Sequence, residues 1–475
     1  MQKEPRLNSQ PERELDVLIL AAGLGKRMKS RQAKVIHHLG GRPLIAHVCR
    51  VAQSLNPRRI YVVVGHQGEK VGAAVREELD EDRAALINQS RQLGTGDAVM
   101  SARPALQDAE SIVLILSGDV PLVRNETLRA LLEAHRSGGG ACTILSVRME
   151  NPTGYGRIVR DEEGCFLKIV EQKDASAEER QIREINSGIY CFDSSKLFNA
   201  LERVEPANQQ GEYYLTDVPA ILLSDSEPVN VYLHSDAREV AGVNTRAELA
   251  EFENLLRRNA IRRLMLEDGV TFIDPSHAYV SAEAQVGRDC VIYPNVQIEG
   301  KTVIGDNCEI RSGTRITNSR IGDNVVIKDH CVIVDSDVAS HCSVGPFAHL
   351  RMNTRLEEGS AVGNFVEVKK SRLGRGSKSM HLTYLGDATI GEKTNIGAGT
   401  VTCNYDGKQK HETIIEDNVK IGSDTMLVAP VTVGSGSVTG AGSVVTKDVP
   451  PDSLVAGVPA VIKKRLIERD DEKEG

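Results

Sequence analysis

Residues 286–316 read VGRDCVIYPNVQIEGKTVIGDNCEIRSGTRI and carry an aliphatic residue at every sixth position. These residues are Val286, Ile292, Ile298, Ile304, Ile310 and Ile316. A constant period of six is typical of a β-helix, in which three short strands form one triangular coil and stacked coils bury an apolar column. This stretch therefore predicts a repeat fold rather than scattered strands.

The same period continues through much of the second half of the chain, with short slips. It resumes at Ile321, runs again from Val338 to Val368, and restarts from Ile415 to Val433. A glycine often follows the aliphatic residue, which suits tight corners because glycine adopts strained conformations without steric cost. We therefore expect a β-helix over residues 269–475, with a charged tail after Pro459.

Composition restricts the class of protein. The chain has 475 residues and a formal net charge of −8, which argues against a nucleic-acid binder because such proteins present a basic surface. Nine cysteines, widely spaced and without a CxxC pair, favour a reducing cytoplasm over zinc or redox chemistry. We also expect no membrane span, no signal peptide, and a loose tail over residues 1–14.

The first half alternates aliphatic runs with helical patterns. Residues 17–20, 60–64 and 112–116 are continuous apolar stretches, which predict parallel strands covered by helices on both faces. We therefore expect an α/β Rossmann-like domain over residues 15–245. Residues 246–268 contain good helix formers at helical spacing, which predict a linker helix before the repeats.

A glycine-rich turn directly follows the first predicted strand. Residues 21–27 read AAGLGKR, and Lys34 lies shortly afterwards. Backbone N–H groups of such a turn can bind phosphate, and Arg27 and Lys34 can neutralise its charge. Taken alone, the pattern is equally compatible with an ordinary tight turn.

Further runs strengthen the phosphate-binding interpretation. In chain order they are residues 89–96 (QSRQLGTG), 118–122 (GDVPL), 154–157 (GYGR), 170–173 (VEQK), 184–188 (EINSG), 211–214 (GEYY) and 242–244 (GVN). With the glycine-rich turn, this ordered set resembles the sugar-1-phosphate nucleotidylyltransferases. The chain departs from that family at Lys26, where threonine is usual, and at Ser117, where some relatives carry tyrosine.

The resemblance implies roles for particular residues of the first half. Asp119 and Asn244 match the family's Mg²⁺ ligands, and two oxygen ligands suit a hard ion that also binds phosphates and water. Arg27 and Lys34 match its catalytic cations. The positions implied for UTP are Ala21, Ala22, Gly23, Gln89, Gly94 and Thr95, and those implied for the sugar phosphate are Gly156, Glu171, Asn186 and Asn244.

Residues 402–412 (TCNYDGKQKHE) interrupt the six-residue period and predict a loop that leaves the coil. Around it lie the runs 345–348 (GPFA), 362–370 (VGNFVEVKK), 381–387 (HLTYLGD), 395–399 (NIGAG) and 403–407 (CNYDG). Both halves together resemble the bifunctional N-acetylglucosamine-1-phosphate uridylyltransferase/glucosamine-1-phosphate N-acetyltransferase family. The resemblance also implies that the coils of the β-helix are left-handed, as they are in the hexapeptide acyltransferase family.

This second resemblance implies an acetyl-transfer site. His381 matches the general base, Asn404 would orient the amine or His381, and Ser423 would stabilise the oxyanion. Arg351 and Lys369 would bind the sugar phosphate, with Tyr384 and Asn395 orienting the ring. The positions implied for acetyl-CoA are Ala398, Asn404, Tyr405, Ser423 and Ala441.

One position at the end of the repeats departs from the bifunctional family. Gly457 stands where the family often has an arginine that contacts CoA. Lys463, Lys464 or Arg465 are the cations that could replace that charge.

The sequence therefore predicts a cytoplasmic, homotrimeric enzyme with small-molecule substrates, bound neither to nucleic acid nor to a membrane. The resemblance implies a UDP-N-acetylglucosamine diphosphorylase and glucosamine-1-phosphate N-acetyltransferase, dependent on Mg²⁺, UTP and acetyl-CoA, that feeds peptidoglycan and lipopolysaccharide synthesis. Two alternatives are a monofunctional sugar-1-phosphate nucleotidylyltransferase with a structural β-helix, and a binding scaffold with a decayed catalytic half.

Overall fold

The structure is a computed structural model that describes residues 13–107 and 110–466. The chain divides into two compact units, residues 1–252 and 253–475. The predicted N-terminal tail and the last nine residues lie almost wholly outside the described residues. In the part of the chain that is described, no helix has both the length and the apolar character needed to cross a bilayer.

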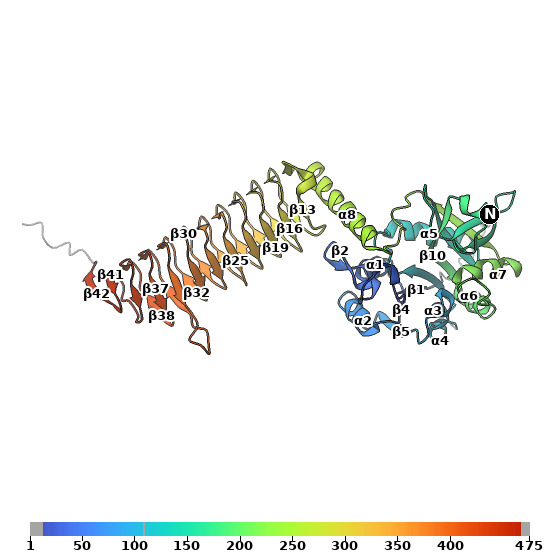
Figure 1. Cartoon of the computed structure of the whole chain (residues 1–475), viewed down its shortest axis with the longest axis horizontal. Coiled ribbons are helices and arrows are strands. Elements are labelled where there is room, and N and C mark those ends of the chain that lie inside the picture. The colour runs from blue at the N-terminus through green and yellow to red at the C-terminus, as the bar shows by residue number, and fades with distance from the viewer. Residues whose placement is uncertain (1–12, 108–109, 467–475) are drawn as a thin grey trace, which may run out of the picture. The chain divides into compact units, whose positions relative to one another are not determined.

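The first unit is built on one nine-stranded sheet (Figure 1). Its main path has the order β11-β7-β10-β6-β1-β4-β5, and the hairpin β8–β9 joins it beside β10. The strands are β1 (Leu15–Leu20), β4 (Arg59–Val64), β5 (Ala84–Asn88), β6 (Ile112–Ser117), β7 (Cys142–Arg148), β8 (Arg157–Arg160), β9 (Phe166–Val170), β10 (Glu184–Asp193) and β11 (Val229–His234).

The sheet is mixed rather than wholly parallel. The three strands predicted from the sequence, β1, β4 and β6, pair in parallel as expected, with Val17 opposite Ile60 and Leu114. Strand β10, however, runs antiparallel to both β6 and β7. The chain reaches β10 through the β8–β9 hairpin and not through a crossover helix, and a parallel neighbour requires such a crossover.

Helices cover both faces of this sheet, which explains the continuous apolar strands. Val17 and Ile19 of β1 belong to one buried cluster, whereas Leu18 belongs to another, because successive strand side chains alternate between faces. The first cluster includes residues of α1 (Leu44–Ser54), α2 (Gly68–Arg76) and α5 (Asn125–Gly138). The second includes residues of α3 (Thr95–Met100), α4 (Arg103–Leu106), α6 (Ser194–Leu201) and α7 (Val218–Ser224).

The predicted linker helix is α8, Arg246–Leu266. Near its end, Ile261 and Leu264 are buried in the same cluster as Phe272 of the first coil. Arg257 donates hydrogen bonds to the carbonyl oxygens of Ser276 and Ala278, at 2.6 and 3.0 Å. The last turns of α8 therefore cover the apolar end of the repeat column.

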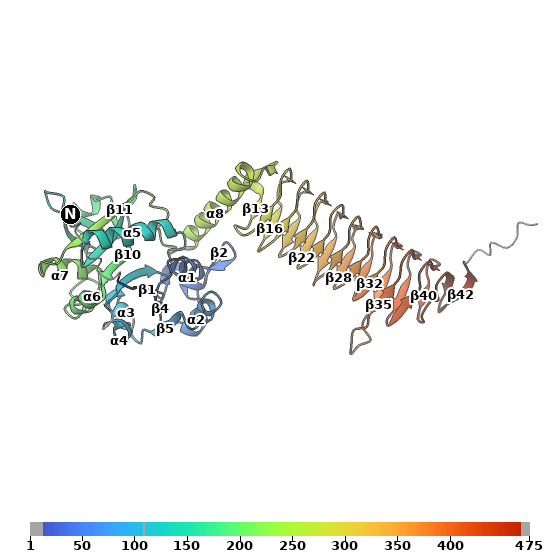
Figure 2. The same cartoon turned by 180° about the vertical axis from the view of Figure 1, so that it is seen from behind.

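The second unit is a parallel β-helix with three sheets (Figure 2). The residues of the six-residue period pair directly between coils, as in Ile292 with Ile310 and Ile298 with Ile316. The slip before Ile321 shortens one coil by a residue. Ile304 still pairs with Ile321 on the next coil, so the missing residue is taken from a corner and not from a strand. The strands that carry candidate site residues are β25 (His349–Arg351), β27 (Ala361–Asn364), β28 (Glu367–Lys369), β30 (Lys378–His381), β31 (Tyr384–Gly386), β33 (Asn395–Ile396), β34 (Val401–Cys403) and β36 (Lys420–Ile421).

The charged tail expected after Pro459 begins with a strand, and its residues 467–475 lie outside the described residues. Ala460–Arg465 form strand β42, which pairs antiparallel with β41 (Ser453–Gly457). The apolar start of this segment, Val461 and Ile462, has high strand propensity, and the last coil otherwise presents an unpaired edge. The charged residues that follow give that edge a polar outer strand.

The aliphatic column should dominate the stability of the β-helix. Ile333 is completely buried in β22 (Val332–Val334), and its replacement by alanine leaves a cavity that flanking coils cannot fill. We expect Ile333→Ala to lower the free energy of unfolding of this unit by about 2–5 kcal/mol, measured by urea denaturation. The control is Ile414→Ala, because Ile414 points outward and is 38% exposed; an equal loss in both variants would contradict the assignment.

Candidate active sites

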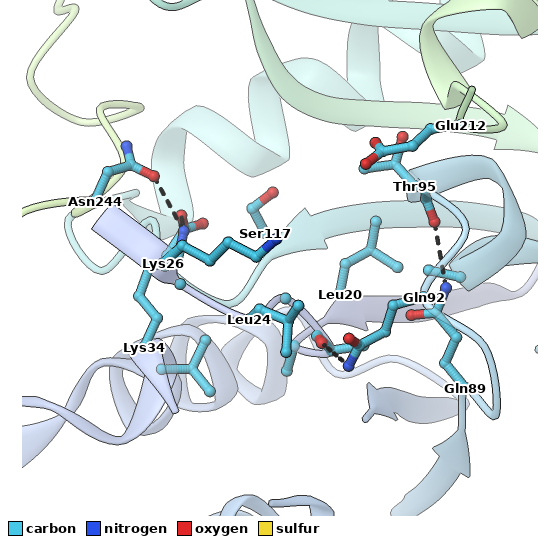
Figure 3. Close-up of a pocket in the computed structure, with 18 of the residues that line it drawn as sticks. Leu20, Leu24, Lys26, Lys34, Gln89, Gln92, Thr95, Ser117, Glu212 and Asn244 are labelled. Carbon is cyan, nitrogen blue, oxygen red and sulfur yellow. Dashed lines mark hydrogen bonds and ion pairs between the residues drawn. The ribbon is translucent and has the colours of Figure 1, made fainter. Parts of the chain in front are cut away.

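A cavity of about 640 Å³ lies where β1, β5 and β6 end (Figure 3). These carboxyl ends are the usual ligand position in an open α/β sheet. The lining includes every residue predicted for the nucleotide, the metal and catalysis in this unit. They are Ala21, Ala22, Gly23, Arg27, Lys34, Gln89, Gly94, Thr95, Asp119 and Asn244.

Several lining residues had no role assigned from the sequence. These are chiefly Gln92, Lys173, Gln210 and Glu212, of which all but Gln210 lie within motifs that the sequence had already singled out. Gln92 donates from Nε2 to the carbonyl oxygen of Ala22 at 3.0 Å, so it supports the glycine-rich turn. The departing residues Lys26 and Ser117 also line the cavity.

At position 94 in the wall of this cavity, only glycine fits the backbone. Its φ of +116° is rarely adopted by other residues, and a Cβ there would lie 2.5 Å from the carbonyl oxygen of Tyr213. That close approach brings Thr95 near the next segment, where its Oγ1 accepts a hydrogen bond from the Leu215 N–H at 3.0 Å. Gln89 donates to Asp97 Oδ2 at 2.7 Å, which fixes its amide at the cavity edge.

The expected metal ligands converge on a cation of the protein itself. The Lys34 ammonium donates to Asp119 Oδ2 and, at 3.1 Å, to Asn244 Oδ1 (Figure 3). Both partners of the Lys34–Asp119 ion pair are largely shielded from solvent. A carboxylate and an amide oxygen that meet at one positive charge are the donor set that Mg²⁺ prefers, so the residues present fit the ion.

The three remaining predicted sugar residues form a separate group. A Cβ on Gly156 would lie 3.4 Å from Glu171 Oε1 and 3.6 Å from Asn186 Cβ, so the three are neighbours. The Asn186 N–H donates to the Gly156 carbonyl oxygen at 2.9 Å. Burial raises the pKa of Glu171, and a hydrogen bond from Thr216 partly opposes this rise.

The raised pKa of Glu171 predicts a pH-dependent cost in stability. A carboxyl group that keeps its proton to higher pH in the folded chain destabilises the fold as pH rises through that pKa. Glu171→Gln should therefore raise the Tm of the first unit at about pH 7 and leave it unchanged at about pH 4. Each kcal/mol gained in the free energy of unfolding should raise the Tm by about 2–4 °C. Calorimetry of this variant beside Glu163→Gln, an exposed control, tests this; equal Tm changes at both pH values would contradict it.

In the β-helix, four predicted residues fall in one column at the corner where the chain turns from one sheet to the next. His381 ends β30 and Ala398 follows β33, and these strands pair with Ser379 opposite Ile396. The next coils continue the column, because Asp424 N–H donates to Ala398 O at 2.7 Å and Gly442 N–H to Ser423 O at 2.8 Å. The structure thus brings together His381, Ala398, Ser423 and Ala441.

His381 is exposed and has a partner on the preceding coil. Its Nδ1 lies 2.9 Å from Asn364 Oδ1. With that oxygen as acceptor, Nδ1 carries the proton of the neutral ring, and Nε2 presents its lone pair as a base. Asn364 lies within the run 362–370, but its contact with His381 follows only from parallel stacking, which places the two residues opposite each other.

Of the predicted sugar-phosphate residues, Tyr384 lies directly after this corner, whereas Arg351 and Lys369 end their strands at the far side of the adjoining sheet, in register with Gly386. Arg351 of β25 pairs with Lys369 of β28, and Tyr384 begins β31 directly after the corner. Arg351 forms an ion pair with Glu367 at 2.6 Å, whereas Lys369 is buried. Asn395 begins β33 and so lies on the other side of this corner from the two cations.

The predicted loop after β34 projects from the stack (Figure 2). Its ends are tied by a bridge between Tyr405 and Lys410 and by the His411 N–H, which donates to Asn404 O at 2.8 Å. Asn404 is buried at the base, whereas the exposed Tyr405 side chain donates to Gly407 O at 2.8 Å within the loop. Lys410 reaches back to Lys369, whose positive charge lowers the Lys410 pKa.

The far end of the helix holds the cations expected to substitute for the missing arginine. Gly457 ends β41 with φ +106°, a conformation that disfavours any replacement. Arg465 on β42 donates to Ser453 Oγ at 2.9 Å, so its guanidinium is engaged within the hairpin. Lys463 and Lys464 are exposed and are the more available cations.

Comparison with known proteins agrees with this division of the chain. Residues 17–214 match the MobA-like NTP transferase domain, residues 275–371 the GMPPB C-terminal domain, and residues 412–447 the bacterial transferase hexapeptide (six repeats). The fold class predicted from the sequence, an α/β Rossmann-like nucleotidyltransferase domain followed by a left-handed parallel β-helix, is confirmed.

Full-length relatives are also similar. The bifunctional protein GlmU of Heliobacterium modesticaldum is 51% identical over 94% of this chain and 95% of its own length. The proteins of that name from a Geobacillus species and from Corynebacterium glutamicum are 47% and 48% identical, over 95% and 92% of this chain and 97% and 90% of their own lengths. The similarity therefore covers both units.

Proposed function

Since the chain belongs to the family of bifunctional GlmU proteins, we propose that it synthesises UDP-N-acetylglucosamine by two transfers at two separate sites. Acetyl transfer from acetyl-CoA to glucosamine-1-phosphate occurs on the β-helix. Uridylyl transfer from UTP to N-acetylglucosamine-1-phosphate then occurs in the first unit and releases pyrophosphate. The observation that supports the proposal is that the predicted nucleotide and metal residues line one cavity of the first unit, while His381, Ala398, Ser423 and Ala441 stack in one column of the β-helix.

The uridylyl transfer is a single in-line displacement. An oxygen of the sugar phosphate attacks the α-phosphorus of UTP, and pyrophosphate leaves as that bond breaks. The glycine-rich turn and Gln89 hold the nucleotide, while Arg27 and Lys34 neutralise charge that develops on the phosphates. Glu171 and Asn186 bind the amino sugar beside Gly156.

Asp119 and Asn244 are the residues that would hold Mg²⁺. A bound Mg²⁺ would supply further neutralisation of the triphosphate. Asp119 Oδ2 and Asn244 Oδ1 converge on the Lys34 ammonium in this structure, so these two oxygens would have to exchange Lys34 for the ion. Lys34 released from this pair is a mobile cation beside the phosphate-binding turn.

The acetyl transfer begins with removal of a proton from the 2-ammonium group of the sugar. His381 Nε2 takes this proton, the amine attacks the thioester carbonyl, and the tetrahedral intermediate collapses to amide and CoA thiol. Ser423 stabilises the oxyanion, and the backbone of Ala398 and Ala441 lines the CoA arm along the same column. Arg351 and Lys369 bind the phosphate, Tyr384 and Asn395 orient the ring, and Tyr405 contacts CoA.

We extend the proposal to a homotrimer formed by the β-helix. Phe347 and Phe365 stack at 5.3 Å on successive coils, and both are about half exposed, as is Leu382 on the next coil. An exposed apolar ridge at the same corner as His381 is suited to burial against a second copy. The nine free cysteines agree with a reducing cytoplasm as the site of action.

Product analysis by mass spectrometry tests the two-step function. The purified chain is incubated with glucosamine-1-phosphate, acetyl-CoA, UTP and Mg²⁺, and each component is omitted in turn. UDP-N-acetylglucosamine should form only in the complete mixture. Uridylylation of supplied N-acetylglucosamine-1-phosphate without any acetylation would instead support a monofunctional transferase with a structural β-helix.

Single substitutions should separate the activities. His381→Ala should lower kcat for acetyl transfer on the order of 10²–10⁴-fold and leave uridylyl transfer intact, because a general base contributes about this much. Asp119→Ala should do the reverse by a similar factor, because a lost metal ligand removes several kcal/mol of charge stabilisation. Release of CoA thiol and of pyrophosphate measures the two rates.

Two matched variants control for general damage. His341→Ala removes an exposed histidine at another corner of the β-helix, and Asp82→Ala removes an exposed carboxylate of the first unit. Both should retain both activities. Loss of both activities in a folded His381→Ala or Asp119→Ala variant would refute the two-site scheme.

A further inference from the structure

Asp387 is a shielded carboxylate beside Asn404 and Lys369 of the proposed acetyl-transfer site, and no role has been assigned to it so far. Its side chain is only 10% exposed, and its backbone is left-handed, with φ +48°. It directly follows Gly386. A Cβ added to Gly386 would lie 2.4 Å from the Tyr384 hydroxyl and 2.8 Å from Asn404 Nδ2, so both side chains pack against this glycine. Asp387 therefore stands beside two residues of the proposed site.

The first consequence concerns the amide of Asn404. Its Nδ2 donates to Asp387 Oδ2 at 2.7 Å. A carboxylate accepts hydrogen bonds and cannot donate them, so it selects the NH₂ end of the amide and turns Oδ1 away. Asn404 Oδ1 is then the end available to accept a hydrogen bond from the sugar amine.

The second consequence concerns the neighbouring lysines. Asp387 lies 3.7 Å from the Lys369 ammonium and 3.4 Å from that of Lys370. Lys410 on the projecting loop also interacts with this carboxylate. Lys369 lowers the pKa of Lys410, and Asp387 partly opposes that decrease. One carboxylate therefore offsets the repulsion among three ammonium groups that lie where the sugar phosphate is proposed to bind.

We propose that Asp387 is the positioning residue of the acetyl-transfer site: it sets the Asn404 amide with Oδ1 toward the amine and holds Lys369 and Lys370 in place through its ion pairs. The inference rests on the proposed acetyl transfer. It assigns Asn404 to the amine rather than to His381, whose Nδ1 is already engaged by Asn364.

The charged groups around these lysines come from several elements. On the loop, Asp406 and His411 pair with each other at 2.8 Å. On the preceding coils, Arg351 pairs with Glu367, and Tyr384 contributes a weak interaction with Lys410. Among the carboxylates named here, Asp387 is the one that pairs with Lys369 and Lys370, so its removal takes away both of these ion pairs.

The test compares Asp387→Ala and Asp387→Asn in the full-length chain. The control is Asp335→Ala, because Asp335 occupies the same left-handed corner three coils earlier, is exposed, and shares the strain that alanine introduces there. Asp387→Ala should lower kcat for acetyl transfer by on the order of 10–100-fold, because the amine loses its orienting partner. KM for glucosamine-1-phosphate at neutral pH should stay within about threefold, because the lysines still bind phosphate.

Asp387→Asn supplies a readout that a structural role would not change. The amide retains the shape and the tolerance for a left-handed backbone but loses the charge. Lys369 lowers the pKa of Lys410 and Asp387 partly opposes this, so without the carboxylate the Lys410 pKa falls further and its ammonium group is lost at lower pH. The alkaline rise of KM for the sugar phosphate should therefore begin about one pH unit earlier than in the unmodified chain.

The outcomes are distinguishable. Absence of acetyl transfer in the unmodified chain would refute the proposed function. An active unmodified chain in which Asp387→Ala behaves like Asp335→Ala, or in which Asp387→Asn leaves the KM–pH profile unmoved, would overturn the role of Asp387 alone. Uridylyl transfer reports only on the first unit, so urea denaturation of the β-helix in every variant confirms that the second unit is folded.

Discussion

Parallel stacking in register is the constraint on which the second unit depends. Every coil must bury its aliphatic residues over those of the coil below, and neighbouring strands then lie about 4.8 Å apart. Residues about seventeen positions apart in the sequence consequently become direct neighbours, as with Asn364 and His381 or Lys369 and Gly386. The proposed acetyl-transfer site is assembled in this way from several coils, each of which contributes one or two polar residues from the corner beside His381 or from the adjoining sheet.

The first unit reaches a comparable result by different means. Parallel strands bring their carboxyl ends to one edge, and the segments that follow them supply the glycine-rich turn, Gln89 and Asp119 to one cavity. Backbone geometry is the critical element there, because Gly94 must approach the Tyr213 backbone more closely than any other residue could. Both sites therefore rest on rigid scaffolds and expose their reactive groups on short connections.

The sequence predicted the larger features because each follows from a local pattern. The six-residue period placed Ile292, Ile310 and Ile327 in the core of the β-helix, and the apolar run of β1 placed its strand correctly. The reversal of β10 and the strand β42 were missed, because pairing direction and edge pairing depend on distant segments. The roles of Asn364 and Asp387 were likewise invisible, since they arise only when different coils are stacked.

The pairing of Lys34 with Asp119 and Asn244 has a consequence for ion selectivity. The protein provides its own monovalent cation, tethered to the chain, at the point where these two oxygens meet. A free sodium or potassium ion carries the same charge as the Lys34 ammonium and must also give up its hydration. Replacing the ammonium by such an ion would therefore gain little binding free energy. A divalent ion offers twice the charge, and a triphosphate that arrives with it provides a new partner for the displaced lysine. At the proposed Mg²⁺ site, the Lys34 pair would therefore favour a divalent ion over a monovalent ion by charge.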